Sequence, residues 1–171
     1  MGENLLRYRW IIGLNGLPPP PPDFYKANWD AAVDKENSKI GVGVIIRDSG
    51  GLIIASLYSS ISLSHDSLLG EAVAALRATS LCSELGLQQI MLEGDSIAVG
   101  QAVQHKDESW SPTGLVIRDI KLLLSKVRTW SIHHIPRKFN VIVHALAKFA
   151  LTSSEEHIFM EDYPPCIQHL L

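Results

Sequence analysis

The sequence predicts an α/β fold in which a mixed five-stranded sheet, with three antiparallel strands followed by parallel ones, is flanked by helices. Two observations predict it. Three strand-like segments follow one another through tight turns between residues 24 and 61, and strands joined in this way pair antiparallel. Further along the chain, strand-like segments alternate with helical ones, which is typical of strands that join a sheet in parallel.

The antiparallel strands are predicted at residues 24–33, 40–47 and 51–61. Polar residues join the first two strands, and a turn that contains Gly50 and Gly51 joins the second and third, because glycines supply the positive backbone angles of a hairpin. Asp30 lies on the first strand, just before Ala31 and Ala32, where a bulky side chain could have packed. This position favours a carboxylate that binds a ligand.

A helix is predicted over residues 68–85, where apolar residues recur at helical spacing and Gly86 supplies the C-terminal cap. Glu71 lies in its first turns. One turn further on, the residues are small alanines, so this side of the helix can approach a sheet closely. A lone glutamate in a helix is usually solvated, and Glu71 taken by itself has that interpretation.

A fourth strand is predicted at residues 89–92, before a helix over residues 97–103. The preceding helix makes a crossover, so this strand lies parallel to the first one. Asp95 falls at its carboxyl end, where ligands bind in open α/β sheets. An aspartate before a helix also commonly caps it, and the two roles can coexist.

The remaining segments predict a loop, an amphipathic helix, a strand and a last helix, at residues 105–113, 115–127, 130–135 and 141–151. Asn140 is a natural N-cap for the last helix, and His144 lies in its first turns. His133 and His134 alternate along the strand, so they point to opposite faces and a shared metal ion is not expected.

Length and composition predict one domain, because 171 residues with 46% hydrophobic side chains can bury one good core but hardly two. We expect a linker over residues 1–23, the domain over residues 24–151, and a tail over residues 152–171 that folds back weakly or not at all. The linker contains a proline run at residues 18–22, which is typical of a stiff extended spacer and suggests a larger region upstream.

The net charge of −3 gives no general attraction to polyanions, so a nucleic acid would need a local basic patch or metal ions. Cys82 and Cys166 are too few for a disulfide framework or a zinc site. The chain has no signal-peptide pattern and no apolar run of ~18 residues. We expect a soluble, intracellular monomer, with nucleus and cytoplasm both open.

Five short motifs follow one another on the expected elements: residues 26–32 (KANWDAA), 41–48 (GVGVIIRD), 71–76 (EAVAAL), 92–96 (LEGDS), and 137–140 (RKFN) with 143–148 (VHALAK). In this order they resemble ribonuclease H domains, and most closely the plant ribonuclease H-like domains found alone or at the end of retrotransposon-type reverse transcriptases. The resemblance covers about residues 24–151 and implies a ribonuclease H-like sheet.

The resemblance also implies a two-metal site, in which Asp30, Glu71 and Asp95 supply the first three carboxylates. Two divalent cations about 4 Å apart can activate a water and stabilise a leaving oxyanion during phosphodiester hydrolysis. Magnesium prefers oxygen ligands, and manganese is the other candidate cation. Without metal, three clustered acids repel one another, so at least one is expected to take up a proton.

The sequence departs from the family at the fourth metal-holding position, where His144 stands in place of the usual aspartate. Three interpretations stay open. His144 is a working substitute that favours manganese, or the second metal is weakened and the protein is a poor or inactive nuclease, or the residue is a plain surface histidine.

The resemblance implies a metal-dependent endoribonuclease that hydrolyses the RNA strand of RNA/DNA hybrids, together with an upstream reverse-transcriptase region in a longer precursor. Arg137, Lys138, Asn140 and Lys148 are the candidate contacts to the nucleic acid, although so short a basic stretch is more often a solvated turn. The alternative is a domesticated module that kept the fold for binding nucleic acid or protein and lost turnover.

Overall fold

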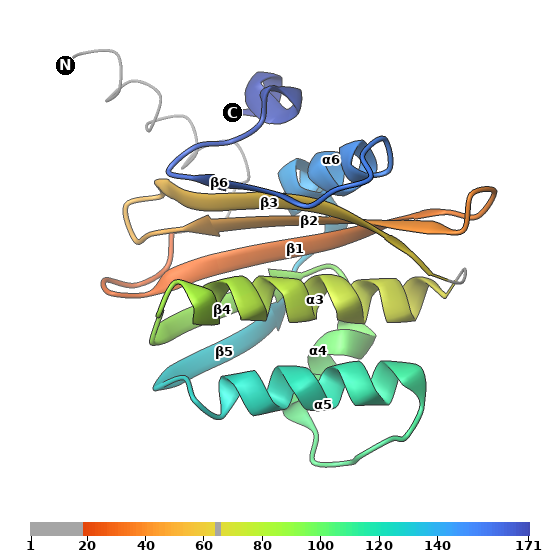
Figure 1. Ribbon diagram of the computed structural model, residues 1–171. Coiled ribbons are helices and arrows are strands. Elements are labelled where there is room, and N and C mark those ends of the chain that lie inside the picture. Colours follow the sequence, from red (N-terminus) through yellow and green to blue (C-terminus); the bar gives the residue numbers. More distant parts are fainter. Residues whose placement is uncertain (1–18, 64–65) are drawn as a thin grey trace.

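The computed structural model describes residues 19–63 and 66–171, so most of the predicted linker, residues 1–18, lies outside the described part (Figure 1). Six strands form one mixed sheet in the order β5-β4-β1-β2-β3-β6. The elements are β1 (Tyr25–Asp34), β2 (Lys39–Arg47), β3 (Ile53–Ser62), α3 (Ser67–Glu84), β4 (Gln89–Gly94), α4 (Ile97–Gln104), α5 (Pro112–Leu124), β5 (Thr129–His134), η1 (Arg137–Phe139), α6 (Val141–Ala150), β6 (His157–Met160) and η2 (Pro165–Leu170).

The predicted antiparallel meander is confirmed, because β1 pairs with β2 and β2 with β3 in antiparallel register. Its second turn is closed by Asp48, whose Oδ1 accepts the backbone N–H groups of Gly50 and Leu52, each at 2.9 Å. Gly51 has a φ of 84°, which is the left-handed conformation expected of a glycine at this turn.

The predicted parallel strands are also confirmed, since β4 pairs with both β1 and β5 in parallel. Within the described sheet, the β1–β4 ladder runs from the Tyr25↔Ile90 pair to the Asn28↔Glu93 pair and no further. Asp30 and Asp95 each lie two residues beyond this last pair. The two strands therefore separate where both carboxylates are placed.

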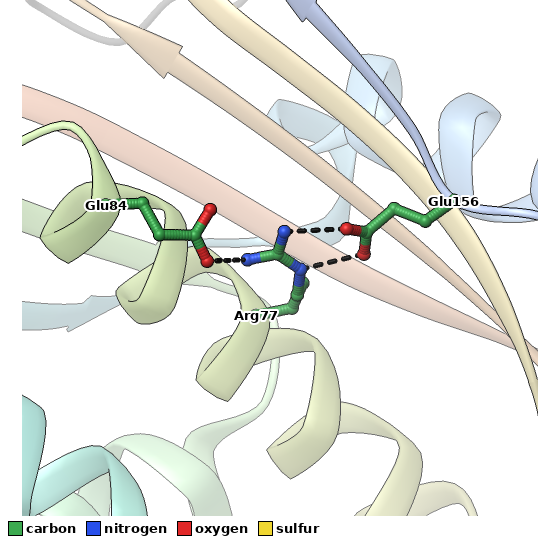
Figure 2. A network of polar contacts seen from close by, with 3 residues as sticks. All are labelled: Arg77, Glu84 and Glu156. Carbon is green, nitrogen blue, oxygen red and sulfur yellow. Dashed lines mark hydrogen bonds and ion pairs between the residues drawn. The ribbon is translucent and has the colours of Figure 1, made fainter.

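The C-terminal segment differs from the weakly attached tail that we expected. Residues 157–160 form β6, a sixth strand that pairs antiparallel with β3, and Ile167 of η2 is fully buried. Arg77 of α3 adds a polar link, because its guanidinium lies 2.7 Å from Glu156 and 2.8 Å from Glu84 (Figure 2). The open edge of β3 thus supplies a partner for this short apolar segment.

The helices lie on both faces of the sheet, with α3, α4 and α5 gathered on one face and α6 and η2 on the other (Figure 1). One hydrophobic cluster joins the sheet to α3, α4 and α5, and a second joins it to α6 and η2. Ala27, Trp29 and Ala31 of β1 belong to the first cluster. By alternation along the strand, Asn28 and Asp30 face the side of α6. None of the described helices is long and apolar enough to cross a membrane.

Helix α6 packs with its backbone against two glycines of β2. A Cβ atom on Gly41 would lie 2.0 Å from the Ala147 carbonyl oxygen, and one on Gly43 would lie 2.3 Å from that of Val143. Only glycine permits this approach. Because Gly43 pairs with Asp30 across the sheet, the close contact also brings the N-terminal turns of α6 over β1.

We expect Gly43→Ala to lower the free energy of unfolding by about 1–3 kcal/mol, since the added methyl group must push α6 away from β2. The matched control is Gly100→Ala in α4, where a Cβ atom meets no described atom within 4 Å and alanine favours a helix by about 1 kcal/mol. Thermal unfolding measures both. A Gly43→Ala protein as stable as the control would contradict this close packing.

Candidate metal centre

Three carboxylates from distant parts of the chain meet at the point where β1 and β4 separate. Asp30 lies on β1, Glu71 in the second turn of α3, and Asp95 directly after β4, and each offers an oxygen within 4.8 Å of the others. Glu71 reaches the sheet because Ala74, Ala75 and Ala78 of α3 are buried against it, as their small size predicts. The structure therefore brings together the three acids that the sequence singled out.

The carboxylates of this acid cluster are short of hydrogen-bond donors. Asp30 is 1% exposed, and its Oδ1 and the Oε2 of Glu71 are buried with no partner among the residues that the structure describes. A buried acceptor without a donor is unfavourable, and more so when it is charged. The cluster thus offers oxygen ligands, two of them buried without a partner, and such ligands suit a hard divalent cation.

Burial also shifts the proton equilibria of the cluster. Desolvation, followed by the charges of Asp30 and Asp95, raises the pKa of Glu71 from 4.5 to about 9. Desolvation and then Asp95 raise the pKa of Asp30, while the hydrogen bond and charge of His144 act in the opposite direction. At neutral pH without a cation, Glu71 therefore holds a proton, which a metal ion has to displace.

His144 contacts the cluster through Asp30. Its Nδ1 lies 2.6 Å from Asp30 Oδ2, and its side chain is 28% exposed at the start of α6. Asp30 has no proton to give when ionised, so Nδ1 carries the hydrogen and donates it. In the neutral ring, Nε2 is then the acceptor. This contact separates His144 from a plain surface histidine.

Asp95 is not the N-cap of α4. Ser96 has that position, and its Oγ accepts the N–H of Val99 at 3.3 Å. The Asp95 carboxylate instead lies 3.7 Å from the Nε of Arg137, whose side chain is 68% exposed. The alternative that Asp95 caps this helix is therefore wrong, and one of its oxygens lies within 4.8 Å of the other two acids.

Three of the four candidate nucleic-acid contacts border one groove. Arg137, Lys138 and Lys148 line it together with Glu71 and His144. The groove thus has one acid of the cluster, Glu71, and three cationic side chains along its walls, an arrangement in which a phosphate can lie beside a carboxylate-bound cation.

Asn140, the fourth candidate, is placed differently from our expectation. It is 2% exposed, and its Nδ2 donates to the backbone oxygen of Trp29 at 2.8 Å. It occupies the N-cap position of α6 but makes no side-chain capping bond in the described structure. Asn140 is therefore too buried for the surface contact with nucleic acid that we assigned to it.

Sequence reasoning missed a buried polar network next to the acids. Lys26 Nζ lies 3.0 Å from Glu93 Oε1, Asn28 Nδ2 donates to Glu93 Oε2 at 3.1 Å, and Arg47 Nη2 donates to Asn28 Oδ1 at 3.1 Å. All four are at least nine-tenths buried. The signal in the sequence is the alternation of Lys26, Asn28 and Asp30, which places three polar side chains on one face of a strand.

Comparisons with known proteins identify a family and a fold. The model of a family described as reverse transcriptase-like matches residues 28–150. A search of curated proteins found no match.

Solved structures confirm the predicted ribonuclease H-like fold. RNase H1 from the halophilic archaeon Halobacterium salinarum NRC-1 is 26% identical over 75% of this chain and 98% of its own, with a TM-score of 0.69. LC11-RNase H1, isolated from compost by a metagenomic approach and solved with an RNA/DNA hybrid, is 20% identical over 75% and 96%, with a TM-score of 0.63. The prototype foamy virus protease-reverse transcriptase is 13% identical over 74% of this chain and 20% of its own, with a TM-score of 0.56.

We expect Glu71→Gln to raise the thermal midpoint of the metal-free protein at pH 8. The pKa of Glu71 is about 9 when folded and 4.5 ordinarily, so the folded state binds the extra proton between these pH values. Stability of the wild type in chelator therefore falls as pH rises from about 4.5 to about 9, and the amide removes this contribution.

Thermal unfolding in chelator between pH 5 and 9 measures the effect, at roughly 2–4 °C for each kcal/mol in a chain of this size. Glu36→Gln in an exposed turn is the control. Equal pH slopes in wild type and Glu71→Gln would contradict the raised pKa of Glu71.

Proposed function

The chain belongs to the reverse transcriptase-like family, and from this premise we propose that it is a metal-dependent endoribonuclease that hydrolyses the RNA strand of RNA/DNA hybrids. The observation that carries the proposal is the meeting of Asp30, Glu71 and Asp95 within 4.8 Å on the ribonuclease H fold. The hybrid in the LC11-RNase H1 structure supports this class of substrate.

The donor set fits magnesium, with manganese as the second candidate, because all three side chains offer hard oxygen atoms. Asp30, Glu71 and Asp95 would hold the cations, with His144 in the fourth position. The unpartnered Oδ1 of Asp30 and Oε2 of Glu71 are the atoms most in need of such a partner. When bound, divalent cations activate a water and stabilise the leaving oxyanion.

The residues around the cluster would orient the acids and the substrate. His144 holds Asp30 Oδ2 through its Nδ1–H, so that carboxylate has a fixed rotation. Arg137, Lys138 and Lys148 border the groove and would neutralise phosphates of the backbone. Arg137 lies 3.7 Å from Asp95, which places its positive charge next to the acids.

We also propose a context for the chain. The similar fold in the foamy virus protease-reverse transcriptase covers one fifth of that protein's length, which supports an upstream reverse-transcriptase region here. From the sequence features given above, we further propose that the chain is a soluble intracellular monomer of plant retrotransposon origin. Residues 1–23 would be its linker.

A binding module without turnover is the second candidate, and the contact between His144 and Asp30 favours it. A histidine at the fourth position brings a nitrogen ligand where the family has a fourth carboxylate, and its Nδ1 already occupies an oxygen of Asp30. A weaker second cation site is the expected consequence, since magnesium prefers oxygen ligands.

Cleavage of an end-labelled RNA/DNA hybrid decides between the two candidates, with single-stranded RNA and duplex DNA as substrate controls. We expect the wild type to cut the hybrid alone. Asp95→Asn should reduce this cutting by more than roughly 10–100-fold, the loss that follows removal of a residue that only supports a metal ligand. Asp119→Asn, on the exposed face of α5, is the matched control and should keep full activity.

Failure of the well-folded protein to cut in either magnesium or manganese would overturn the enzyme proposal. Asp95→Asn would then bind the hybrid as tightly as wild type or more tightly, because a negative charge has been removed beside the phosphates.

The role of the fourth position is tested by His144→Asp. We expect this change to raise the cleavage rate in magnesium relative to manganese, because a carboxylate replaces a nitrogen donor. His133→Asp, on the exposed part of β5, is the control. An unchanged ratio of the two rates would show that His144 does not influence the cations.

A further inference from the structure

Asn140 connects three segments that border the acid cluster. Its Nδ2 donates to the backbone oxygen of Trp29, the residue before Asp30, at 2.8 Å. Its own carbonyl accepts the backbone N–H of His144 at 3.0 Å, and its N–H donates to the carbonyl of Arg137 at 2.9 Å. The side chain, the N–H and the carbonyl of this one residue thus join β1, the first turn of α6 and the turn that carries Arg137.

The position is costly for a residue that only begins a helix. Asn140 is 2% exposed, yet its Oδ1 has no hydrogen-bond partner among the described residues. It lines a cavity of about 10 Å³ with Asn28 and Arg47, which is close to the volume that one water molecule needs. A helix start alone is served by a cap that is not buried, as partly exposed Ser96 and exposed Ser111 show for α4 and α5.

The apolar packing of α6 does not fix the position of the helix along its own axis, so a directional hydrogen bond has to do so. The helix lies against Gly41 and Gly43 of β2 and against apolar side chains, and apolar contacts are non-directional. The 2.6 Å contact between His144 and Asp30 tolerates little sliding of the helix, because hydrogen bonds weaken steeply with distance and angle. The bond from Asn140 to Trp29 fixes α6 to β1 next to the residue that His144 must meet.

We propose that Asn140 is a positioning residue, which fixes the start of α6 on β1 so that Nδ1 of His144 lies against Asp30. This inference rests on the proposed role of Asp30 and His144 in the metal centre. The contact between His144 and Asp30 can nevertheless be measured in protein that contains no metal and performs no reaction.

The test compares the His144 imidazole in wild type, Asn140→Ala and Ser56→Ala by ¹⁵N and ¹H NMR in chelator, with His144→Gln to assign the signal. Ser56→Ala is matched because it also removes a buried bond from a side chain to a backbone carbonyl, that of Ser56 Oγ to Asp162 at 2.9 Å on β3. A hydrogen-bonded Nδ1–H gives a downfield proton signal that exchanges slowly with water.

We expect this signal in wild type and Ser56→Ala, and its loss in a folded Asn140→Ala. Both variants lower the thermal midpoint, so the NMR signal separates positioning from a general loss of stability. An unchanged signal in Asn140→Ala would overturn the proposal. If the alanine variant does not fold, Asn140→Ser makes the same comparison, because its shorter side chain keeps a polar group at the start of α6 without reaching Trp29.

Manganese titration gives a second readout. We expect the affinity of Asn140→Ala for manganese to fall about 10–100-fold, as for other residues that orient a metal ligand, while Ser56→Ala stays at the wild-type value. If no variant binds metal and the NMR signal still depends on Asn140, the proposed nuclease fails while the positioning role stands. If manganese binds and the NMR signal does not depend on Asn140, the positioning role fails while the proposed nuclease stands.

Discussion

Repulsion among three clustered carboxylates is the constraint that the rest of this structure has to accommodate. Asp30, Glu71 and Asp95 lie within 4.8 Å of one another in a largely buried place, where like charges are expensive. A raised pKa of Glu71 lessens this repulsion when no cation is present. The two-sided core of the sheet supplies the stability that allows such a cluster to persist.

The supports of the cluster come in pairs of residues on adjoining elements. Asn28 and Glu93 form the last pair of the β1–β4 ladder, and their side chains are hydrogen-bonded to each other two residues before Asp30 and Asp95. Asn140 joins α6 to β1 beside Asp30. Each support lies where one strand or helix has to be held against another, so the directional bonds are concentrated at the divergence of the strands.

Much of the fold was predictable because alternation, helical spacing and turn residues mark its elements. Asp30 and Asp95 stood out by their places on a strand and at a strand end, whereas Glu71 was singled out only through the resemblance to the family. The β6 strand was not predictable from the sequence, because four residues between polar segments carry too weak a pattern. These residues form a strand only at the edge of β3. Asn140 was misread for a related reason. A sequence shows that asparagine can cap a helix, but only the packed fold shows that the side chain turns inward to Trp29.

The pairing of β6 with β3 carries the folded sheet beyond the end of the family match. The family model stops at residue 150, whereas the sheet continues to Met160 and Glu156 is anchored by Arg77 (Figure 2). A fragment cut at the family boundary would expose the backbone donors and acceptors of β3 along residues 55–58. Uncovered strand edges of this kind recruit other chains, so aggregation of a shortened fragment would report a missing strand and not a defective fold.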